Sequence, residues 1–449
     1  MWLFFRFCNW IGDISNTIIL TPTPYAVGNA AEEVYFGLLK ARRENRKLLV
    51  IFPFELPWKL TFHLINVDIL QIKSEHMLQL PFCFNLIARC LITAIYAMNK
   101  LIGLFLRIFL SKNFFRSAIY NVPMIGAMTL WQPRDLMRGF SWKVVDEYNW
   151  RDQIGTQLNV QPRVDDDQFF RRNCLSIGLP GDAWFVCIHV RESGFHDDEA
   201  SERNANILNY IPAIKEVTGR GGWVIRLGDK SMTPLPDIER VIDYPFTDVK
   251  SPLMDMLLIS KCSLYIGMTS GIYDLALLFQ RPIILTNISS WLFGLPPKKT
   301  DICVMKHIYS KSRGRFLSIK EWLDEPWDSM SFRTLGSDYV LFENTKDELL
   351  RSVKWYFERG ALWTPTQVQI DFQRLRRENG RRILDSPIFF GDTAQQNRAN
   401  KVENPFEPDD HLYDTMERYR LASRLDSSEA MLEPYYLIEN WEIDNYQAI

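Results

Sequence analysis

The sequence lacks several features that would assign it to a class at once. Its seven cysteines, at positions 8, 83, 90, 174, 187, 262 and 303, form no C-x-x-C pair and have no histidine at metal-ligand spacing. Neither a disulfide framework nor a structural zinc site is therefore expected. Residues 1–10 are apolar but lack the basic start and the small-residue cleavage site of a signal peptide. We expect free thiols and a cytoplasmic protein.

A large excess of charge of either sign is also missing. Lys and Arg number 52 and Asp and Glu number 54, a net charge of −2, whereas a dedicated nucleic-acid binder usually carries a large basic excess. The balance hides an asymmetry, because residues 1–150 hold 16 basic and 10 acidic side chains, and residues 361–449 hold 10 basic and 16 acidic ones. The basic part keeps an anionic membrane surface among the expected partners.

The most apolar stretch, residues 77–110, has no charge-free run near the roughly 18–20 residues that a membrane-spanning helix needs. Its charged residues are Arg89, Lys100 and Arg107. On a helix, at about 100° per residue, these three lie within roughly 20° of one another and apolar side chains fill the rest. The pattern predicts a helix in the membrane interface with these cations as contacts. The alternative is a buried helix whose cationic stripe reaches water.

Strand and helix signals alternate in two parts of the chain. Residues 17–20 and 47–54 are expected to be strands around a helix at 30–46, which is one βαβ unit of a parallel sheet. A longer alternation follows, with strands expected at 184–190, 223–227, 241–244, 264–267 and 282–286 and helices at 207–218, 252–260, 272–279 and 346–358. We predict an α/β fold with two Rossmann-like, doubly wound domains facing a cleft. Their expected bounds are 1–165, with the apolar helix 77–110 inserted, and 166–360, followed by a helical or irregular extension at 361–449 with a loosely ordered acidic tail.

Polar residues suited to a diphosphate follow three strands of the second domain. His189 and Arg191 end the first strand on one face, because side chains two residues apart point the same way. An Arg guanidinium there can hold a diphosphate through two parallel hydrogen bonds. The other two elements are Arg226 with Gly228-Asp229, and Thr269-Ser270-Gly271 at a helix start, where backbone amides and the helix dipole favour an anion.

Each of these elements has a purely structural alternative. Arg191 could pair with Glu192 or Asp197, the Ser270-Gly271 pair could be only a helix start, and His189 could be a satisfied core residue. Their occurrence at neighbouring strand ends favours one shared phosphate site that needs no metal.

The region from Cys187 to Asn287 resembles a family of bacterial glycosyltransferases of surface-polysaccharide gene clusters. The matching segments are HVRESG, RNANILNYIPAI, GGWVIRLGDKSM, VIDYPF, MDMLLISKCSLYIGMTSG and PIILTN. That family in turn resembles the O-fucosyltransferase and α-1,6-fucosyltransferase superfamily, in which a His-x-Arg strand binds the GDP of the donor. The resemblance implies the GT-B fold, inversion at the anomeric carbon and no cofactor, with a GDP-sugar as the favoured co-substrate.

The resemblance also implies roles for individual residues. The first domain becomes the acceptor domain and the second the donor domain, with Arg191 on the donor phosphates. The residues expected around the donor are His189, Arg191, Arg203, Asn204, Arg226, Gly228, Asp229, Thr269, Ser270 and Gly271. Gly28, Asn29 and Glu32 are expected on the acceptor side. This chain has Glu192 where the fucosyltransferases usually have a second Arg or an acidic-loop pattern, which leaves the base and the sugar open.

The general base that inversion requires is expected in the loop after the His-x-Arg strand. Asp197 and Glu199 are the candidates there, and Glu32 and Glu33 compete with them from the first domain. Asp165-Asp166-Asp167 contains a D-x-D pattern that can hold a metal with a sugar nucleotide. A solvated turn or a helix cap is the favoured interpretation of that triplet, so no metal is expected.

The sequence therefore favours a metal-independent, inverting glycosyltransferase. It would transfer a sugar to a lipid-linked or surface-polysaccharide acceptor at the inner face of the cell membrane, as a peripheral protein. The alternative is a non-catalytic nucleotide-sugar-binding subunit of a polysaccharide assembly complex. A sugar epimerase on the same scaffold is disfavoured, because no G-x-G-x-x-G follows either first strand.

Overall fold

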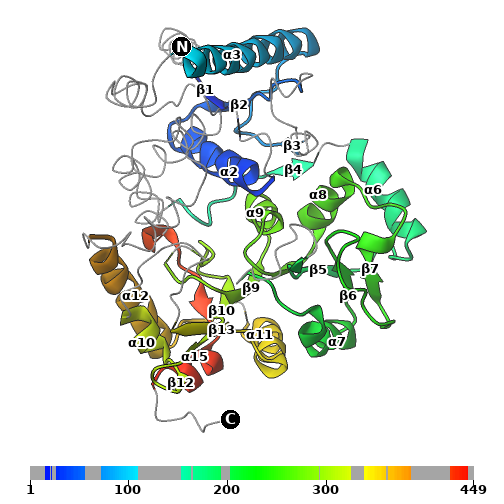
Figure 1. The fold of residues 1–449 in the computed structure, drawn as a ribbon. Coiled ribbons are helices and arrows are strands. Elements are labelled where there is room, and N and C mark those ends of the chain that lie inside the picture. The colour runs from blue at the N-terminus through cyan, green and yellow to red at the C-terminus, as the bar shows by residue number, and fades with distance from the viewer. Residues whose placement is uncertain are drawn as a thin grey trace.

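The computed structural model describes residues 16–20, 22, 27–55, 72–109, 153–162, 165–193, 203–292, 294–324, 338–360, 363–385 and 425–442. These residues form an α/β fold, in which helices surround a parallel sheet (Figure 1). The α/β class expected from the sequence, with a Rossmann-like doubly wound sheet, is confirmed. Asp197 and Glu199, the two base candidates of the second domain, lie outside the described residues.

The N-terminal part contains the predicted βαβ unit. Strand β1 (Thr17–Leu20) pairs in parallel with β2 (Lys47–Val50), and α2 (Val27–Arg43) connects them. Helix α2 starts three residues before the predicted position, so Gly28 lies in its first turn. This unit lies within residues 1–165, the expected first Rossmann-like domain.

The large sheet has seven strands, all parallel to their neighbours. In order across the sheet they are β7 (Val241–Asp243), β6 (Trp223–Arg226), β5 (Phe185–His189), β8 (Leu264–Gly267), β9 (Ile283–Ile288), β10 (Ile302–Met305) and β14 (Met431–Leu432). The first six follow the 3-2-1-4-5-6 order of the Rossmann fold. The chain therefore reverses its direction of winding between β5 and β8.

Both faces of this sheet are covered, as expected for parallel strands that read as continuous apolar runs. Along β5, Val186 and Ile188 pack into one buried cluster, while Phe185 and Cys187 pack into the other. The first cluster also includes side chains of α7 (Ile211–Gly219) and α11 (Lys346–Glu358). The second includes side chains of α8 (Pro252–Lys261), α9 (Gly271–Leu278) and α2, so the N-terminal unit shares the core of the large sheet.

The C-terminal tail corrects one prediction. Within the tail that was expected to be loosely ordered, β14 adds to the large sheet beside β10, and α15 (Pro434–Asn440) buries Tyr436 and Leu437. Helix α12 (Gln367–Asp385) is joined to β14 and the residue before it through Gln369 and Gln373, whose amide groups donate to the carbonyls of Leu432 and Ala430 at 2.5 and 2.6 Å. The described part of the tail is therefore ordered and forms part of the large sheet and its surroundings.

The remaining elements lie around this core. Helix α6 (Asp165–Ser176) starts at the Asp165 triplet, and Asp167 pairs with Lys261 at 2.6 Å, which agrees with the helix-cap interpretation. Strands β11 (His307–Ser310), β12 (Arg315–Phe316) and β13 (Tyr339–Phe342) form a small antiparallel sheet next to α10 (Ile319–Asp324). Strands β3 (Ile72–Lys73) and β4 (Gln161–Pro162) form a second antiparallel pair.

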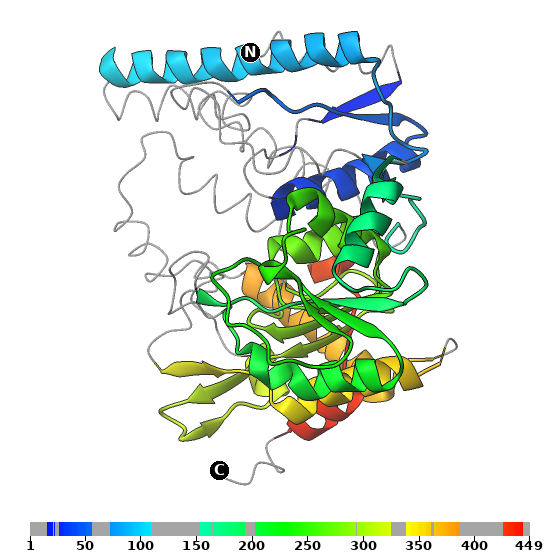
Figure 2. The same cartoon turned by 90° about the vertical axis from the view of Figure 1, so that its right-hand side faces the viewer.

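Helix α3 (Phe82–Phe109) is the predicted apolar helix, and it lies along one end of the molecule (Figure 2). Its N-terminal half exposes Phe82, Phe84, Leu86, Ile87 and Leu91. Within the described part of the chain, no helix has the length and apolar character that crossing a membrane requires.

Candidate donor site at the switch point of the sheet

The reversal between β5 and β8 brings two of the predicted elements together. Ligands of doubly wound sheets bind outside the carboxyl ends of the strands where the winding reverses. His189, the last residue of β5, stands directly opposite Gly267, the last residue of β8. Arg191 follows two residues after His189, and Ser270 follows three residues after Gly267. The predicted His-x-Arg strand end and the predicted anion-binding helix start are therefore neighbours.

His189 is buried, with 7% of its surface exposed. Its Nδ1 lies 3.2 Å from the carbonyl oxygen of Leu227. Because a carbonyl only accepts, Nδ1 carries the proton and Nε2 keeps its lone pair. Burial lowers the pKa of His189 to about 4, although the Leu227 hydrogen bond acts in the opposite direction. At neutral pH the ring is therefore uncharged and can accept a hydrogen bond from a ligand.

The end of β8 allows a close backbone approach. A Cβ on Gly267 would lie 2.7 Å from the carbonyl oxygen of His189, so only glycine fits there. Ser270 then occupies the N-cap position of α9 in an extended conformation, without a side-chain capping hydrogen bond. Thr269 and Ser270 are half-buried and Gly271 is exposed. The start of α9 thus offers backbone amides and the positive end of the helix dipole to an anion.

The N-terminus of α2 meets the N-terminus of α9 at this place. A Cβ on Gly28 would lie 2.6 Å from the Cα of Gly271 and would overlap the carboxylate of Asp274. Gly28, expected on the acceptor side, is thus packed against the donor-side helix. Glu32 is half-buried and Glu33 is buried, and both carboxylates have interaction partners. The side chain of Asn29 lies outside the described part of the chain.

Arg226 belongs to the second predicted element, and its surroundings differ from the prediction. It is 0% exposed, and its guanidinium pairs with Glu192 at 3.2 Å and with Asp243 at 3.1 Å. It also donates to the carbonyl oxygen of Thr233 at 2.7 Å. Since two carboxylates already balance its charge, the burial and pairing of Arg226 disfavour the expected contact with donor phosphates. The residue instead fixes the segment after β6, and Glu192 is engaged with Arg226 and with the amide of Thr233.

Gly228 and Asp229 shape the turn after β6. Gly228 has a φ of +149°, and a Cβ there would overlap Met232, so the position requires glycine. The Asp229 carboxylate accepts hydrogen bonds from the Ser231 amide at 2.8 Å and the Ser231 hydroxyl at 2.5 Å. Both residues directly follow Leu227, whose carbonyl oxygen accepts the hydrogen bond of His189.

Arg203 and Asn204 lie next to the end of β5. The amide of Ala205 donates to the carbonyl oxygen of Arg191 at 2.9 Å. Lys306, which follows β10 at the same edge of the sheet, donates from Nζ to the carbonyl oxygen of Asn204 at 2.7 Å. Lys306 is only 4% exposed and was missed in the sequence, where the signal would have been a lysine directly after the apolar run 302–305. Three cationic residues, Arg191, Arg203 and Lys306, thus belong to this edge.

A buried polar network continues from the same edge to the C-terminal helix. Thr286 donates to the carbonyl oxygen of Gly267 at 2.9 Å and contacts the hydroxyl of Tyr210 at 2.6 Å. Asn287 and Asn344 exchange hydrogen bonds between their amides and side chains at 2.7 and 2.8 Å. This network was not predicted, because its members come from segments far apart in the chain.

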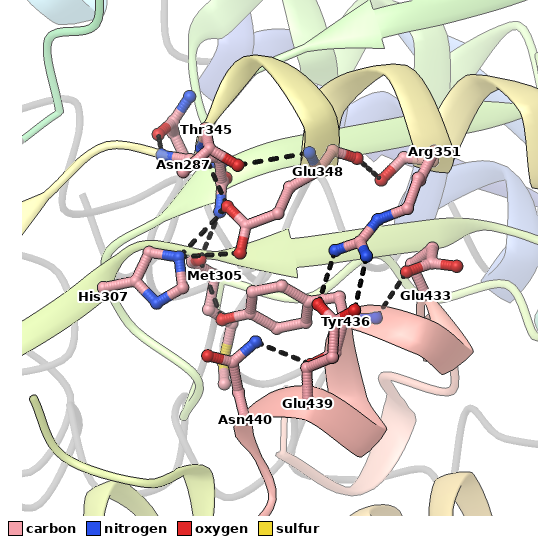
Figure 3. A network of polar contacts seen from close by, with 12 residues as sticks. Asn287, Met305, His307, Thr345, Glu348, Arg351, Glu433, Tyr436, Glu439 and Asn440 are labelled. Atoms are coloured by element: carbon pink, nitrogen blue, oxygen red, sulfur yellow. Dashed lines mark hydrogen bonds and ion pairs between the residues drawn. The ribbon is translucent and has the colours of Figure 1, made fainter. Parts of the chain in front are cut away.

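Glu348 forms the centre of the next part of the network (Figure 3). Its carboxylate lies 2.8 Å from Nε2 of His307 and accepts the amide of Thr345 at 2.8 Å. Burial acts to raise the pKa of Glu348, but His307 and the Thr345 amide outweigh it and the pKa is lowered. Tyr436 of α15 donates to the carbonyl oxygen of Met305 at 3.0 Å. The C-terminal helix therefore contacts the end of β10, directly before Lys306.

The membrane-contact residues give a mixed outcome. Arg89 turns toward the protein, where its Nε donates to the carbonyl oxygen of Phe52 at 3.0 Å and its guanidinium lies 4.0 Å from the centre of the Phe54 ring. Burial lowers its pKa. These contacts orient Arg89 toward the protein, and its expected contact with lipid headgroups stays a prediction, while the side chains of Lys100 and Arg107 lie outside the described part.

No protein-family model matches the chain, and no curated protein sequence matches it. Solved structures overlap it in part. The ADP-heptose lipopolysaccharide heptosyltransferase II of Escherichia coli is 14% identical over 60% of this chain and 83% of its own, with a TM-score of 0.32. A glycosyl transferase family 9 protein from Veillonella parvula is 10% identical over 62% and 82%, with a TM-score of 0.34. The iron-containing dodecameric glycosyltransferase TibC of enterotoxigenic E. coli is 15% identical over 61% and 58%, with a TM-score of 0.28.

Proposed function

We propose that the protein is an inverting, metal-independent glycosyltransferase that binds a nucleotide-sugar donor at the junction of β5 and β8. The observation that carries this proposal is the juxtaposition of the His189-x-Arg191 strand end with the uncapped start of α9, at the reversal point of the sheet. A guanidinium and a helix N-terminus together supply positive charge for a diphosphate leaving group. The resemblance to the fucosyltransferase superfamily favours a GDP-sugar as the donor.

Each proposed role follows from the placement of a residue. Arg191 binds the diphosphate and stabilises the charge that develops when the sugar leaves. Neutral His189 accepts a hydrogen bond from the nucleotide or the sugar through Nε2. Thr269, Ser270 and Gly271 hold the phosphates at the start of α9, and Arg203 and Asn204 border the donor. Asp197 or Glu199 remains the proposed base that takes the proton of the acceptor hydroxyl.

Turnover with a panel of donors tests this function. The full chain is incubated with GDP-, UDP- and ADP-sugars, and release of the nucleoside diphosphate is measured with and without extracted lipid-linked glycans. The proposal predicts release with one base and its loss in Arg191→Ala. Binding of a nucleotide-sugar without any release would favour the alternative, a non-catalytic binding subunit of a polysaccharide assembly complex.

We also propose that α3 holds the protein at the inner face of the cell membrane, near a lipid-linked acceptor. Support comes from the outward face of its N-terminal half, where Leu86, Ile87 and Leu91 are exposed, while Arg89 between them in the sequence turns toward the carbonyl oxygen of Phe52. The inward face is fixed by Arg89 and by Thr93, whose hydroxyl accepts the amide of Phe54 at 2.7 Å. The net basic charge of residues 1–150 suits anionic lipids.

Liposome flotation tests the membrane contact. The wild-type protein is expected to float with vesicles rich in anionic lipid, and a Leu86→Ser, Ile87→Ser, Leu91→Ser variant is expected to stay at the bottom. Ile370→Ser, at an exposed apolar position of α12, is the matched control and should float. Equal flotation of the triple variant would contradict the proposal. So would a wild-type protein that binds no vesicles, if the triple variant at the same time loses self-association.

A further inference from the structure

Lys306 is a buried cation at the carboxyl edge of the large sheet. It directly follows β10, and only 4% of its surface is exposed. Its Nζ donates to the main-chain carbonyl oxygen of Asn204 at 2.7 Å. Because moving a lysine ammonium out of water costs free energy, a lysine at this position indicates a task beyond filling space.

The main chain that carries the Lys306 side chain is fixed by three hydrogen bonds. The amide of Lys306 donates to the carbonyl oxygen of Ile288, the last residue of β9, at 2.9 Å. The carbonyl oxygen of the preceding residue, Met305, accepts the side-chain amide of Asn344 at 2.7 Å and the hydroxyl of Tyr436 at 3.0 Å (Figure 3). The ammonium group therefore extends from a rigid base.

The group that Lys306 holds is the peptide unit between Asn204 and Ala205. Its carbonyl oxygen accepts the Lys306 ammonium, and its N–H, on Ala205, donates to the carbonyl oxygen of Arg191 at 2.9 Å. Because a peptide unit is planar and rigid, fixing its oxygen also fixes the direction of its N–H. Hydrogen bonds that share one group in this way also polarise one another, so a cation at the oxygen strengthens the bond to Arg191.

A direct action of Lys306 on Arg191 does not fit the order of the strands. Strands β8 and β9 lie between β5 and β10. Since neighbouring strands are about 4.8 Å apart, Lys306 starts roughly 14 Å from the end of β5, which is more than a lysine side chain spans. The ammonium therefore reaches Arg191 through the Asn204–Ala205 peptide unit.

We propose that Lys306 is a positioning residue for Arg191, which it holds through the Asn204–Ala205 peptide unit so that the guanidinium is directed at the diphosphate of the donor. This inference rests on the proposed function, in which Arg191 binds that diphosphate. Lys306 thus contributes to donor affinity without touching the donor.

Calorimetric titration of the full chain with GDP, UDP and ADP tests the inference. Lys306→Met keeps the apolar stem and removes the ammonium, and it is expected to bind the preferred nucleotide about fivefold more weakly, a coupling typical of residues in one hydrogen-bond network. Lys306→Gln, whose side chain is one bond shorter and uncharged, is expected to show the same loss and provides the test if Lys306→Met does not fold.

Lys298→Met is the matched control. Lys298 precedes β10 at the opposite edge of the sheet, is nearly buried, and donates to the carbonyl oxygens of Gln280 and Arg281. Its replacement also removes a buried ammonium, so the thermal midpoint should fall while nucleotide binding stays like that of the wild type. An equal loss of affinity in Lys298→Met would show a general effect of destabilisation and would overturn the positioning role.

A double-mutant cycle tests whether the effect passes through Arg191. In an Arg191→Ala background no guanidinium remains to be positioned, so Lys306→Met should cause no further loss of affinity. If both Lys306 variants bind like the wild type, or if the fivefold loss persists in the Arg191→Ala background, the inference is overturned while the proposed function stands. If the wild-type protein binds none of the three nucleotides, the proposed function fails together with it.

Discussion

The Nδ1 of His189 donates a hydrogen bond to the carbonyl oxygen of Leu227, at the carboxyl ends of the neighbouring strands β5 and β6. This bond fixes the tautomer of the ring, and burial keeps the ring neutral with a pKa lowered to about 4. The histidine is therefore a fixed hydrogen-bond acceptor at the candidate donor site, and a role as a titrating acid or base at neutral pH is disfavoured.

The lowered pKa of His189 predicts how stability depends on pH. The unfolded chain protonates its histidine near pH 6.5 and the folded chain only near 4, so the unfolded state binds more protons between these values. The contribution of His189 is complete above pH 6.5 and is lost as the pH falls toward 4, by up to about 3 kcal/mol. Urea unfolding from pH 7.5 to 4.5 should show this loss, and His189→Asn should remove it. An equal pH slope in both proteins would contradict the prediction.

Asp301, directly before β10, predicts the opposite pH dependence. Burial raises its pKa to about 6, although Lys298 acts to lower it. The folded state then holds the proton more tightly, so stability is present below pH 4 and is lost as the pH rises through 6. Asp301→Asn should be more stable than the wild type above pH 6, by about 1–3 kcal/mol, with the advantage vanishing near pH 4. A difference that does not vary with pH would contradict this account of Asp301.

Arg226 is predicted to stabilise the fold without binding the donor. Arg226→Met would leave Glu192 and Asp243 without their cation, which should cost about 3–5 kcal/mol. Arg226→Met combined with Glu192→Gln and Asp243→Asn should recover part of that loss, because no buried charge is then left unpaired. Thermal unfolding of the three proteins measures this. Full stability of the single variant would contradict the buried ion-pair role.

The contact between α2 and α9 predicts strict size limits at Gly28. A methyl group there would collide with Gly271, so Gly28→Ala should cost about 1–3 kcal/mol through overpacking. Gly219, at the end of α7, is the matched control, because a Cβ there meets nothing within 4 Å and its φ is not positive. Gly219→Ala should be neutral or slightly stabilising. Equal denaturation midpoints for both variants would contradict the close helix packing.

Much of the fold could be predicted from the sequence because parallel strands buried on both faces appear as short apolar runs. The runs predicted at 184–190, 223–227 and 264–267 are observed as β5, β6 and β8. Strand β14 has only two residues, which gives no periodicity to detect. Its place in the sheet depends on a contact with β10, more than a hundred residues earlier in the chain.

The candidate site was predictable only as far as strand ends reveal it. His189 and Ser270 were expected to be neighbours because the carboxyl ends of parallel strands share one edge, and the strand order places them there. The neutralisation of Arg226 could not be predicted, because nothing in the sequence shows that Glu192 and Asp243 reach it. The inward turn of Arg89 likewise depends on Phe52 and Phe54, which precede Arg89 by about three dozen residues.

The binding of nucleoside diphosphates tests the central claim most directly. Titration of GDP, UDP and ADP into the full chain should give a measurable dissociation constant for one of them. Arg191→Ala should weaken that constant by about tenfold to a hundredfold, the range expected for hydrogen bonds to a charged group. Arg171→Ala, which removes an exposed charge on α6, should leave it unchanged. Binding that is equally tight in Arg191→Ala, or the absence of binding to all three nucleotides, would contradict a donor site between β5 and β8.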